Sequence, residues 1–256
     1  MTLLSVEHVT RQYSLPRNSL FSPARTITAV DAANFTLERG KTLGIVGESG
    51  SGKSTLARMV MAFEKPNTGR VLFEGKDLAA LRAAELRALR PHFQLVFQDP
   101  FGSLNPRRTV GWSIAEPLRA TDTPDDGRVA EALDHVGLRA ADAGKFPHEF
   151  SGGQRQRVAI ARAIVTRPSL LVADEAVSAL DMSVQAQILN LLMDLQDDLG
   201  LAILFISHDL SVVGSICDSI LVMEHGKSVE YGAAADVMQS PKQPYTRSLL
   251  KASGLI

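Results

Sequence analysis

The chain has 256 residues, of which 45% are hydrophobic and 21% charged, and these values suit one globular unit with a sizeable core. Its 27 basic and 28 acidic side chains give a formal net charge of -1, which argues against a nucleic-acid binder because such proteins usually carry a clear basic excess. The single cysteine, Cys217, excludes an internal disulfide framework and a cysteine-ligated metal cluster within one chain.

The first hundred residues begin without a signal-peptide pattern and alternate short strands with a helix. Strands are predicted at Leu4–Tyr13 and Thr28–Leu37, and the segment Ser14–Ala29, which contains two prolines, is predicted as a loop. The run Thr42–Val46 is a short apolar strand that ends at a glycine-rich turn, and a helix is expected over Lys53–Phe63. No run approaches the ~18 consecutive apolar residues of a membrane helix, so work at a membrane would require attachment through partners.

Three short apolar runs later in the chain fit buried strands of a parallel sheet. They are Gln94–Phe97, Leu170–Ala173 and Ile203–Ile206. Between the last two, Ser183–Leu199 has apolar residues at helical spacing, so the alternation predicts an α/β layered core. The segment from about 99 to 150 shows no clear buried strand and is predicted as a helical lobe inserted into that core. Two short helices are expected near Ala233–Gln239 and Pro244–Ala252.

A glycine-rich turn after the strand at Thr42–Val46 matches the pattern G-x-x-x-x-G-K-[ST] of a phosphate-binding loop. Its residues are Gly47, Glu48, Ser49, Gly50, Ser51, Gly52, Lys53 and Ser54. Glycines let backbone amides turn toward a phosphate, and the N-terminus of the following helix adds free N–H groups and partial positive charge. Lys53 can reach the outer phosphates, and the Ser54 hydroxyl suits Mg²⁺. A glycine-rich loop that binds nothing is the alternative, and the flanking strand and helix argue against it.

An acidic pair, Asp174 and Glu175, follows the buried strand at Leu170–Ala173. If that strand ends near the phosphate loop, both carboxylates lie beside the nucleotide. Asp174 would hold Mg²⁺ through its water shell, and Glu175 would polarise the attacking water. An Asp-Glu pair on a solvated turn is the common alternative, and the position at the end of a buried strand disfavours it.

Two more polar groups follow predicted strands. His208 lies at the carboxyl end of the strand at 202–206, where ligands bind in open α/β sheets, and it can contact a terminal phosphate. A helix-capping turn through Ser207 or Asp209 is the alternative for that segment. Gln98 follows the strand at 94–97 and can ligate Mg²⁺ or orient water, although taken alone it is an ordinary polar loop residue.

The segment from Phe150 to Arg157 reads FSGGQRQR and closely resembles the signature motif of ABC ATPases. Ser151 and two glycines lead into an apolar helix, which gives a second helix N-terminus suited to an anion. An ordinary helix capped by the Ser-Gly-Gly turn is the alternative for this segment taken alone. Together with the phosphate loop, the acidic pair, His208 and the sequence SALD at 178–181, it gives a resemblance that covers essentially the whole chain. In that family two such domains face head to tail, and the signature of one closes on the ATP held by the other.

The resemblance implies the fold of a P-loop NTPase. This is a RecA-like α/β domain with a mostly parallel sheet, an antiparallel β subdomain and an inserted helical subdomain. The α/β core would span about 1–97 and 155–256, and the helical subdomain about 98–154. All of these would belong to one ATPase domain.

The same resemblance implies ATP and Mg²⁺ as cofactors and gives roles to individual residues. Tyr13 would stack on the adenine, and Gly47 to Thr55 would bind the phosphates of ATP. Ser151, Gly153 and Gln154 would contact the partner's ATP, and Asp181 would communicate across the dimer. Mg²⁺ would be held by Ser54, Gln98 and Asp174. The catalytic residues would be Glu175 as general base and His208 as switch, with Gln98 and Lys53. One departure is Ala176, because a proline usually follows the acidic pair; neither carboxylate changes, so hydrolysis is still expected.

Three segments narrow the resemblance to ATPases of importers for short peptides or nickel. They are QDPFGSLNPR at 98–107, VSALD at 177–181 and QPYT at 243–246. In this branch two different ATPase chains usually act on two transmembrane permease subunits that are fed by an extracytoplasmic solute-binding protein. The resemblance therefore implies a heterodimer at the cytoplasmic face of the inner or plasma membrane. The C-terminal extension of longer members, often with cysteines, is not expected after Ile256.

Three other functions remain open at this point. One is an ABC-type ATPase accessory to a soluble complex such as carbon–phosphorus lyase. Another is an ABC ATPase of DNA repair, although the coiled coils or zinc modules of that class are missing from the sequence. The third is a nucleotide-binding scaffold without hydrolysis. The transported solute itself is chosen by the binding protein and the permeases.

Overall fold

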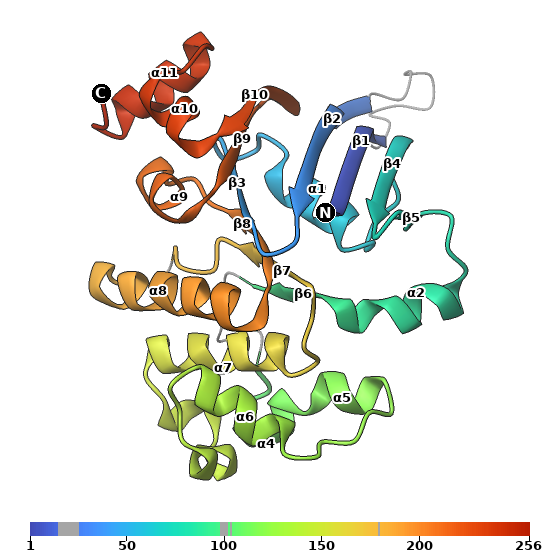
Figure 1. Ribbon diagram of the computed structural model, residues 1–256, viewed down its shortest axis with the longest axis vertical. Coiled ribbons are helices and arrows are strands. Elements are labelled where there is room, and N and C mark those ends of the chain that lie inside the picture. The colour runs from blue at the N-terminus through green and yellow to red at the C-terminus, as the bar shows by residue number, and fades with distance from the viewer. Residues whose placement is uncertain (15–25, 98–101, 103, 179) are drawn as a thin grey trace, which may run out of the picture. The chain divides into compact units, whose positions relative to one another are not determined.

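The computed structural model describes residues 1–14, 26–97, 102, 104–178 and 180–256 (Figure 1). Backbone contacts divide these residues into two compact units. Unit 1 comprises residues 1–38, 42–81 and 206–256, and unit 2 comprises residues 39–41 and 82–205. The chain therefore leaves unit 1 after residue 81 and returns to it at residue 206.

Unit 1 is built on a sheet with the strand order β5-β4-β1-β2-β10-β9-β3. Its strands are β1 (Thr2–Ser14), β2 (Thr26–Glu38), β3 (Thr42–Val46), β4 (Thr68–Phe73), β5 (Lys76–Asp77), β9 (Ser219–Glu224) and β10 (Lys227–Ala233). Its helices are α1 (Lys53–Val60), α9 (Leu210–Ile216), α10 (Ala234–Gln239) and α11 (Pro244–Ala252). β1 lies between β2 and β4 and pairs antiparallel with both (Figure 1). β3, in contrast, pairs in parallel with β9.

Burial in unit 1 follows the place of each strand in the sheet. β2 buries Ala33, Phe35 and Leu37 with exposed residues between them, the period-2 pattern of a strand with one solvated face. β3 is buried at all of its positions, as expected for a strand covered on both faces. The chain therefore passes directly from the buried carboxyl end of β3 into residues 47–52.

Unit 2 combines strands with most of the helices. Its strands are β6 (Phe93–Val96), β7 (Leu170–Asp174) and β8 (Ala202–Ile206), of which Ile206 belongs to unit 1. Its helices are α2 (Ala83–Leu89), α4 (Val110–Ile114), α5 (Glu116–Ala120), α6 (Arg128–His135), α7 (Gly152–Ile164) and α8 (Met182–Leu199), with 3-10 turns η1 (Arg90–His92), η2 (Ala140–Gly144) and η3 (Pro147–Glu149). β6 and β7 pair in parallel, and α4, α5 and α6 pack against α7 (Figure 1). The described chain between β6 and β7 is thus helical, as predicted.

The predicted elements are present, with some ends displaced. The helix expected over Lys53–Phe63 ends at Val60, because Ala62 takes a left-handed conformation with φ 50° and the Phe63 N–H turns back to the Arg58 carbonyl, as in a Schellman turn. β2 begins at Thr26, inside the segment predicted as a loop, and residues 15–25 lie outside the described chain. The boundaries expected for a helical subdomain, about 98–154, remain a prediction, since the backbone divides into compact units elsewhere.

Candidate functional site

The turn between β3 and α1 requires glycine at two positions. Gly47 has φ 150°, and a Cβ there would lie 2.2 Å from the Met223 carbonyl oxygen. Gly52 has φ 104°, and a Cβ there would lie 2.3 Å from the Ala29 carbonyl oxygen. Both conformations are strained for residues with a side chain, and backbone from β2 and β9 fills the space. The loop is therefore held closely against the sheet of unit 1.

The same turn presents groups suited to an anion. Lys53 is 5% exposed, and its Nζ donates to the carbonyls of Gly47 at 2.7 Å and Glu48 at 2.9 Å. α1 begins at that lysine with no acidic residue in its first turn and no side-chain cap in the described chain. The buried Ser51 Oγ has no hydrogen-bond partner among the described residues. An uncapped helix N-terminus, a buried ammonium and an unsatisfied hydroxyl together fit a phosphate chain.

His208 lies in unit 1, at the end of β8. The preceding Ser207 donates its N–H to the Ile45 carbonyl in β3 at 3.2 Å, so this turn lies beside the strand that leads into the phosphate loop. The His208 side chain is exposed. Asp209 caps α9 through the N–H of Ser211 at 2.8 Å, which confirms the helix-capping alternative for Asp209. The role of His208 as a switch stays a prediction.

Tyr13 lies at the end of β1, opposite Ile27 of β2. Its hydroxyl donates to Glu64 Oε2 at 2.5 Å, and the Arg11 guanidinium carbon lies 4.7 Å from the ring centroid. Neither Arg11 nor Glu64 was predicted from the sequence as a site residue. The i, i+2 spacing of Arg11 and Tyr13 on one strand was a usable signal, whereas Glu64 is 51 residues away from Tyr13 and leaves no local pattern.

Tyr245 of α11 also reaches the phosphate loop. Its hydroxyl accepts a hydrogen bond from the Glu48 N–H at 3.3 Å. Burial raises the pKa of the Tyr245 hydroxyl, and the hydrogen bond from the Glu48 N–H lowers it by less. The net pKa is above its ordinary value, so the phenol is neutral at physiological pH. The sequence analysis noted this tyrosine only as part of the QPYT segment. The contact spans 197 residues, so only the fold reveals it.

Unit 2 carries the predicted signature residues at the start of α7. Ser151 caps the helix by accepting from the Gln154 N–H at 3.4 Å, and the Gln154 side chain accepts from the Ser151 N–H at 3.0 Å. This reciprocal capping box fixes the turn. A Cβ on Gly153 would lie 2.5 Å from Val184 Cγ1, so glycine is also needed for the approach of α8. The three residues have structural roles within the chain whether or not a partner binds them.

Unit 2 also carries the acidic pair and Asp181. Asp174 ends β7, and Glu175 follows with φ 49°, a left-handed conformation that is uncommon for non-glycine residues but also occurs in this chain at turns such as Ala62 and His225. Asp181 caps α8 and accepts from Ser183 Oγ at 2.7 Å and the Val184 N–H at 3.0 Å. These two hydrogen bonds lower the Asp181 pKa, so its carboxylate stays charged at neutral pH.

The predicted residues thus divide between the two units. Unit 1 holds Tyr13, the phosphate loop and His208, whereas unit 2 holds the signature residues, Asp174, Glu175 and Asp181. Gln98 lies outside the described residues.

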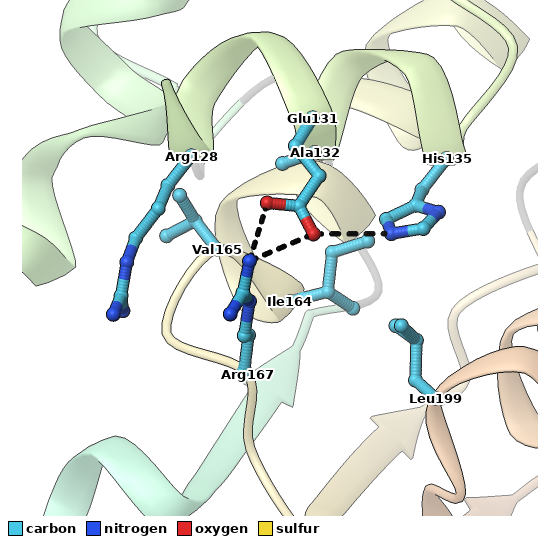
Figure 2. Close-up of a pocket in the computed structure, with 8 residues that line it drawn as sticks. All are labelled: Arg128, Glu131, Ala132, His135, Ile164, Val165, Arg167 and Leu199. Atoms are coloured by element: carbon cyan, nitrogen blue, oxygen red, sulfur yellow. Dashed lines mark hydrogen bonds and ion pairs between the residues drawn. The ribbon is translucent and has the colours of Figure 1, made fainter. Parts of the chain in front are cut away.

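A hollow in unit 2 contains none of the predicted residues (Figure 2). It is lined by Arg128, Glu131, Ala132, His135, Ile164, Val165, Arg167 and Leu199. Arg167 donates two hydrogen bonds to the Glu131 carboxylate, at 2.9 and 2.6 Å, and lowers its pKa. His135 Nε2 lies 3.7 Å from the same carboxylate. The Arg167–Glu131 ion pair ties α6 to the segment after α7, whereas His135 and Glu131 both belong to α6.

Comparison with known proteins gives consistent matches. A family model described as "ABC transporter" matches residues 30–178. The chain is 48% identical over 241 residues to the dipeptide transport ATP-binding protein DppF of Escherichia coli (strain K12), covering 93% of this chain and 72% of DppF. It is 46% identical over 257 residues to the oligopeptide transport ATP-binding protein AppF of Bacillus subtilis (strain 168), covering 98% of this chain and 78% of AppF. Among solved structures, a dimeric post-hydrolysis state of the ATP-binding cassette MJ0796 bound to ADP and Pi is similar, with a TM-score of 0.78, 28% identity, and coverage of 91% of this chain and 99% of that chain.

Proposed function

Since the chain belongs to the ABC transporter family and is an ATP-binding and ATP-hydrolysing subunit, we propose that it powers the import of short peptides. The observation that carries the proposal is the 48% identity to the dipeptide transport ATP-binding protein, which extends over 93% of this chain. The second relative is named for oligopeptides, so the wider alternative of nickel has less support. Neither relative is named for carbon–phosphorus lyase, and that accessory role has no support from them.

The phosphate loop of unit 1 would bind the ATP phosphates through residues Gly47 to Thr55. Lys53 Nζ donates to two carbonyls of its own loop, and these contacts would be exchanged for phosphate oxygens. The free N–H groups at the start of α1 point along the helix axis and add to the same attraction. Tyr13 would take the adenine, and the backbone around Gly52 lies against β2, the strand paired with Tyr13.

Hydrolysis would depend on Mg²⁺ and on acidic side chains. Ser54 is exposed in the first turn of α1, and we expect Ser54, Gln98 and Asp174 to be the oxygen ligands that Mg²⁺ prefers. Mg²⁺, when bound, offsets the negative charge of the phosphates. Glu175 would orient the attacking water and accept its proton, and His208 would contact the terminal phosphate.

The second half of the site would come from another subunit. Ser151, Gly153 and Gln154 would contact the ATP of a related ATPase, and Asp181 would connect the two sites. The solved neighbour is a dimer bound to ADP and Pi, which supports a dimeric working state. ATP held by two chains favours the closed dimer, and hydrolysis removes that preference.

The ATPase pair would act on two permease subunits at the cytoplasmic face of the membrane, with an extracytoplasmic solute-binding protein delivering the peptide. No helix in the described part of the chain is long and apolar enough to cross a bilayer. We expect the chain to attach to the permeases and its ATPase partner to be a different but related chain.

Substitution of Glu175 by glutamine tests this proposal. We expect ATPase activity of the chain, purified together with its native subunits, to fall at least ~100-fold, because the water loses its proton acceptor. ATP should then hold a closed dimer, seen as an ATP-dependent shift in size-exclusion chromatography. Glu85→Gln, on the exposed surface of α2, is the matched control. Full activity of Glu175→Gln contradicts the proposal, and copurification with soluble enzymes in place of permeases would favour the carbon–phosphorus lyase alternative.

A further inference from the structure

We propose that Glu64, together with Arg11, is a positioning residue for the nucleotide base, because the two side chains hold the Tyr13 ring on which the base stacks. The proposal deepens the nucleotide-binding function and depends on it. Tyr13 donates its hydroxyl to Glu64 Oε2 at 2.5 Å. Arg11 Nε donates to the same oxygen at 3.0 Å, and Arg58 Nε lies 2.7 Å from Oε1.

Glu64 is itself held firmly. Its side chain is only 14% exposed, and both oxygens are engaged with charged or hydroxyl donors. The Tyr13 hydroxyl is the largest influence lowering the Glu64 pKa, and Arg58 and Arg11 lower it further, so the carboxylate remains an acceptor at physiological pH. Hydrogen bonds to an ionised acceptor are stronger than neutral ones. The hydroxyl end of the tyrosine is therefore fixed.

Arg11 fixes the ring in a second way. Its guanidinium carbon lies 4.7 Å from the Tyr13 ring centroid, within the range of a cation–π contact. The base would then stack on the opposite face of the ring. With its hydroxyl anchored and one face covered, the ring keeps a single orientation before the base binds. Less side-chain conformational entropy is therefore lost when the base stacks on it.

The anchor is built into the element that carries the phosphate loop. Glu64 follows α1 by a short turn in which the Glu64 N–H donates to the Arg58 carbonyl at 3.3 Å. The segment after Glu64 also fastens β1, because the Lys65 carbonyl accepts from Arg11 Nη1 at 3.1 Å and the Asn67 side-chain oxygen Oδ1 accepts from the Gln12 N–H at 2.7 Å. α1 thus begins at the phosphate loop and leads into the turn that carries Glu64. One helix therefore connects the residues that would bind the phosphates with the residue that holds the Tyr13 ring.

The experiment compares two ligands that differ only by adenosine. We would measure the Kd of the full chain for ADP and for inorganic pyrophosphate by calorimetry, in the wild type, Tyr13→Phe, Glu64→Ala and the double variant. Tyr13→Phe keeps the ring and removes only its anchor. Glu7→Ala is the matched control, because Glu7 forms an ion pair with Arg70 at 2.7 Å on the same strand β1.

We expect Tyr13→Phe and Glu64→Ala each to weaken ADP binding roughly 3- to 10-fold, a part of the affinity that base–aromatic stacking provides. The double variant should bind ADP no more weakly than Glu64→Ala, since both changes break one hydrogen bond. The Kd for pyrophosphate should change less than about twofold in every variant, and Glu7→Ala should leave both values unchanged. Circular dichroism confirms folding, and Tyr13→Phe carries the test if Glu64→Ala does not fold.

Three results would overturn the inference: additive effects in the double variant, equal losses of ADP and pyrophosphate binding, or unchanged ADP binding in both single variants. A wild-type chain that binds neither ligand would instead contradict the proposed nucleotide function. If the wild-type chain binds ADP and pyrophosphate with equal Kd, the phosphate loop is still a binding site, but the Tyr13 ring adds nothing to affinity and the inference is wrong.

Discussion

The Lys53 ammonium group is the most confined charge of the phosphate loop. Lys53 is only 5% exposed, and the carbonyls of Gly47 and Glu48 in its own turn accept hydrogen bonds from the ammonium group. Removing a charge from water is costly unless the protein replaces the lost hydration, and the two carbonyls do so here. The lysine is therefore pre-positioned for a phosphate, which offers a full negative charge in place of two dipoles.

We expect Lys53→Met to separate binding from folding. Methionine keeps much of the apolar stem and removes the buried charge, so the thermal midpoint without nucleotide should stay within a few degrees of the wild type. ATP affinity should fall roughly 10- to 100-fold, because a hydrogen bond to a charged group contributes about 1.5–3 kcal/mol. Thermal shift with and without ATP measures both quantities. A midpoint that still rises with ATP as it does in the wild type would contradict the role of Lys53.

Short helices of unit 2 depend on side-chain caps, and η2 is a clear case. Asp142 is 6% exposed and accepts from the Arg139 N–H at 3.0 Å, while Lys145 Nζ lies 2.7 Å from its other oxygen. The hydrogen bond from Lys145, followed by that from the Arg139 N–H, lowers the Asp142 pKa to about 2. Since the ordinary value is 3.8, the carboxylate is favoured in the folded chain.

This lowered pKa predicts how stability depends on pH. A group whose folded pKa is depressed stabilises the protein above its unfolded pKa, and that contribution is lost as pH falls from about 4 toward 2. Asp142→Asn should therefore be less stable than the wild type at pH 7, and the difference should shrink below pH 4. Urea unfolding of both proteins across this pH range measures it. A difference that grows as the solution is acidified would show that Asp142 is not held as a carboxylate.

Local elements could be predicted from the sequence, and contacts between distant segments could not. The strand at Thr42–Val46, its glycine turn and the helix at Lys53 are contiguous, so one window of sequence contains the whole pattern. Glu64 with Tyr13, and Tyr245 with Glu48, are joined only by the fold. The hairpin of β9 and β10 was also missed, because its turn at His225 and Gly226 has histidine where Asn, Asp or Gly usually precedes the glycine.

The candidate site shows the same limit in another form. Ser151 and Gln154 form a capping box, and the Ser-Gly-Gly helix cap was only the alternative to the role toward a partner's ATP that the resemblance implies. Gly153 likewise is needed for packing against Val184. Because capping or packing within one chain already explains each of these residues, their identity alone does not establish contact with a partner's ATP. A test needs a variant that disturbs this contact and leaves the fold of the chain intact.

Gly152 offers that variant at the scale of the assembled molecule. A Cβ at this position meets no atom within 4 Å, so the fold has room for a side chain, and an aspartate in the first turn of α7 suits the helix dipole. We expect Gly152→Asp to fold and to bind ATP like the wild type. If the turn closes on the triphosphate of a second subunit, the added carboxylate repels it in a poorly hydrated interface, and ATPase activity of the assembled complex should fall more than ~10-fold. Gly144→Asp, at another position with open space in unit 2, is the control and should keep full activity. Equal activity of the two variants would mean that this surface does not meet a nucleotide.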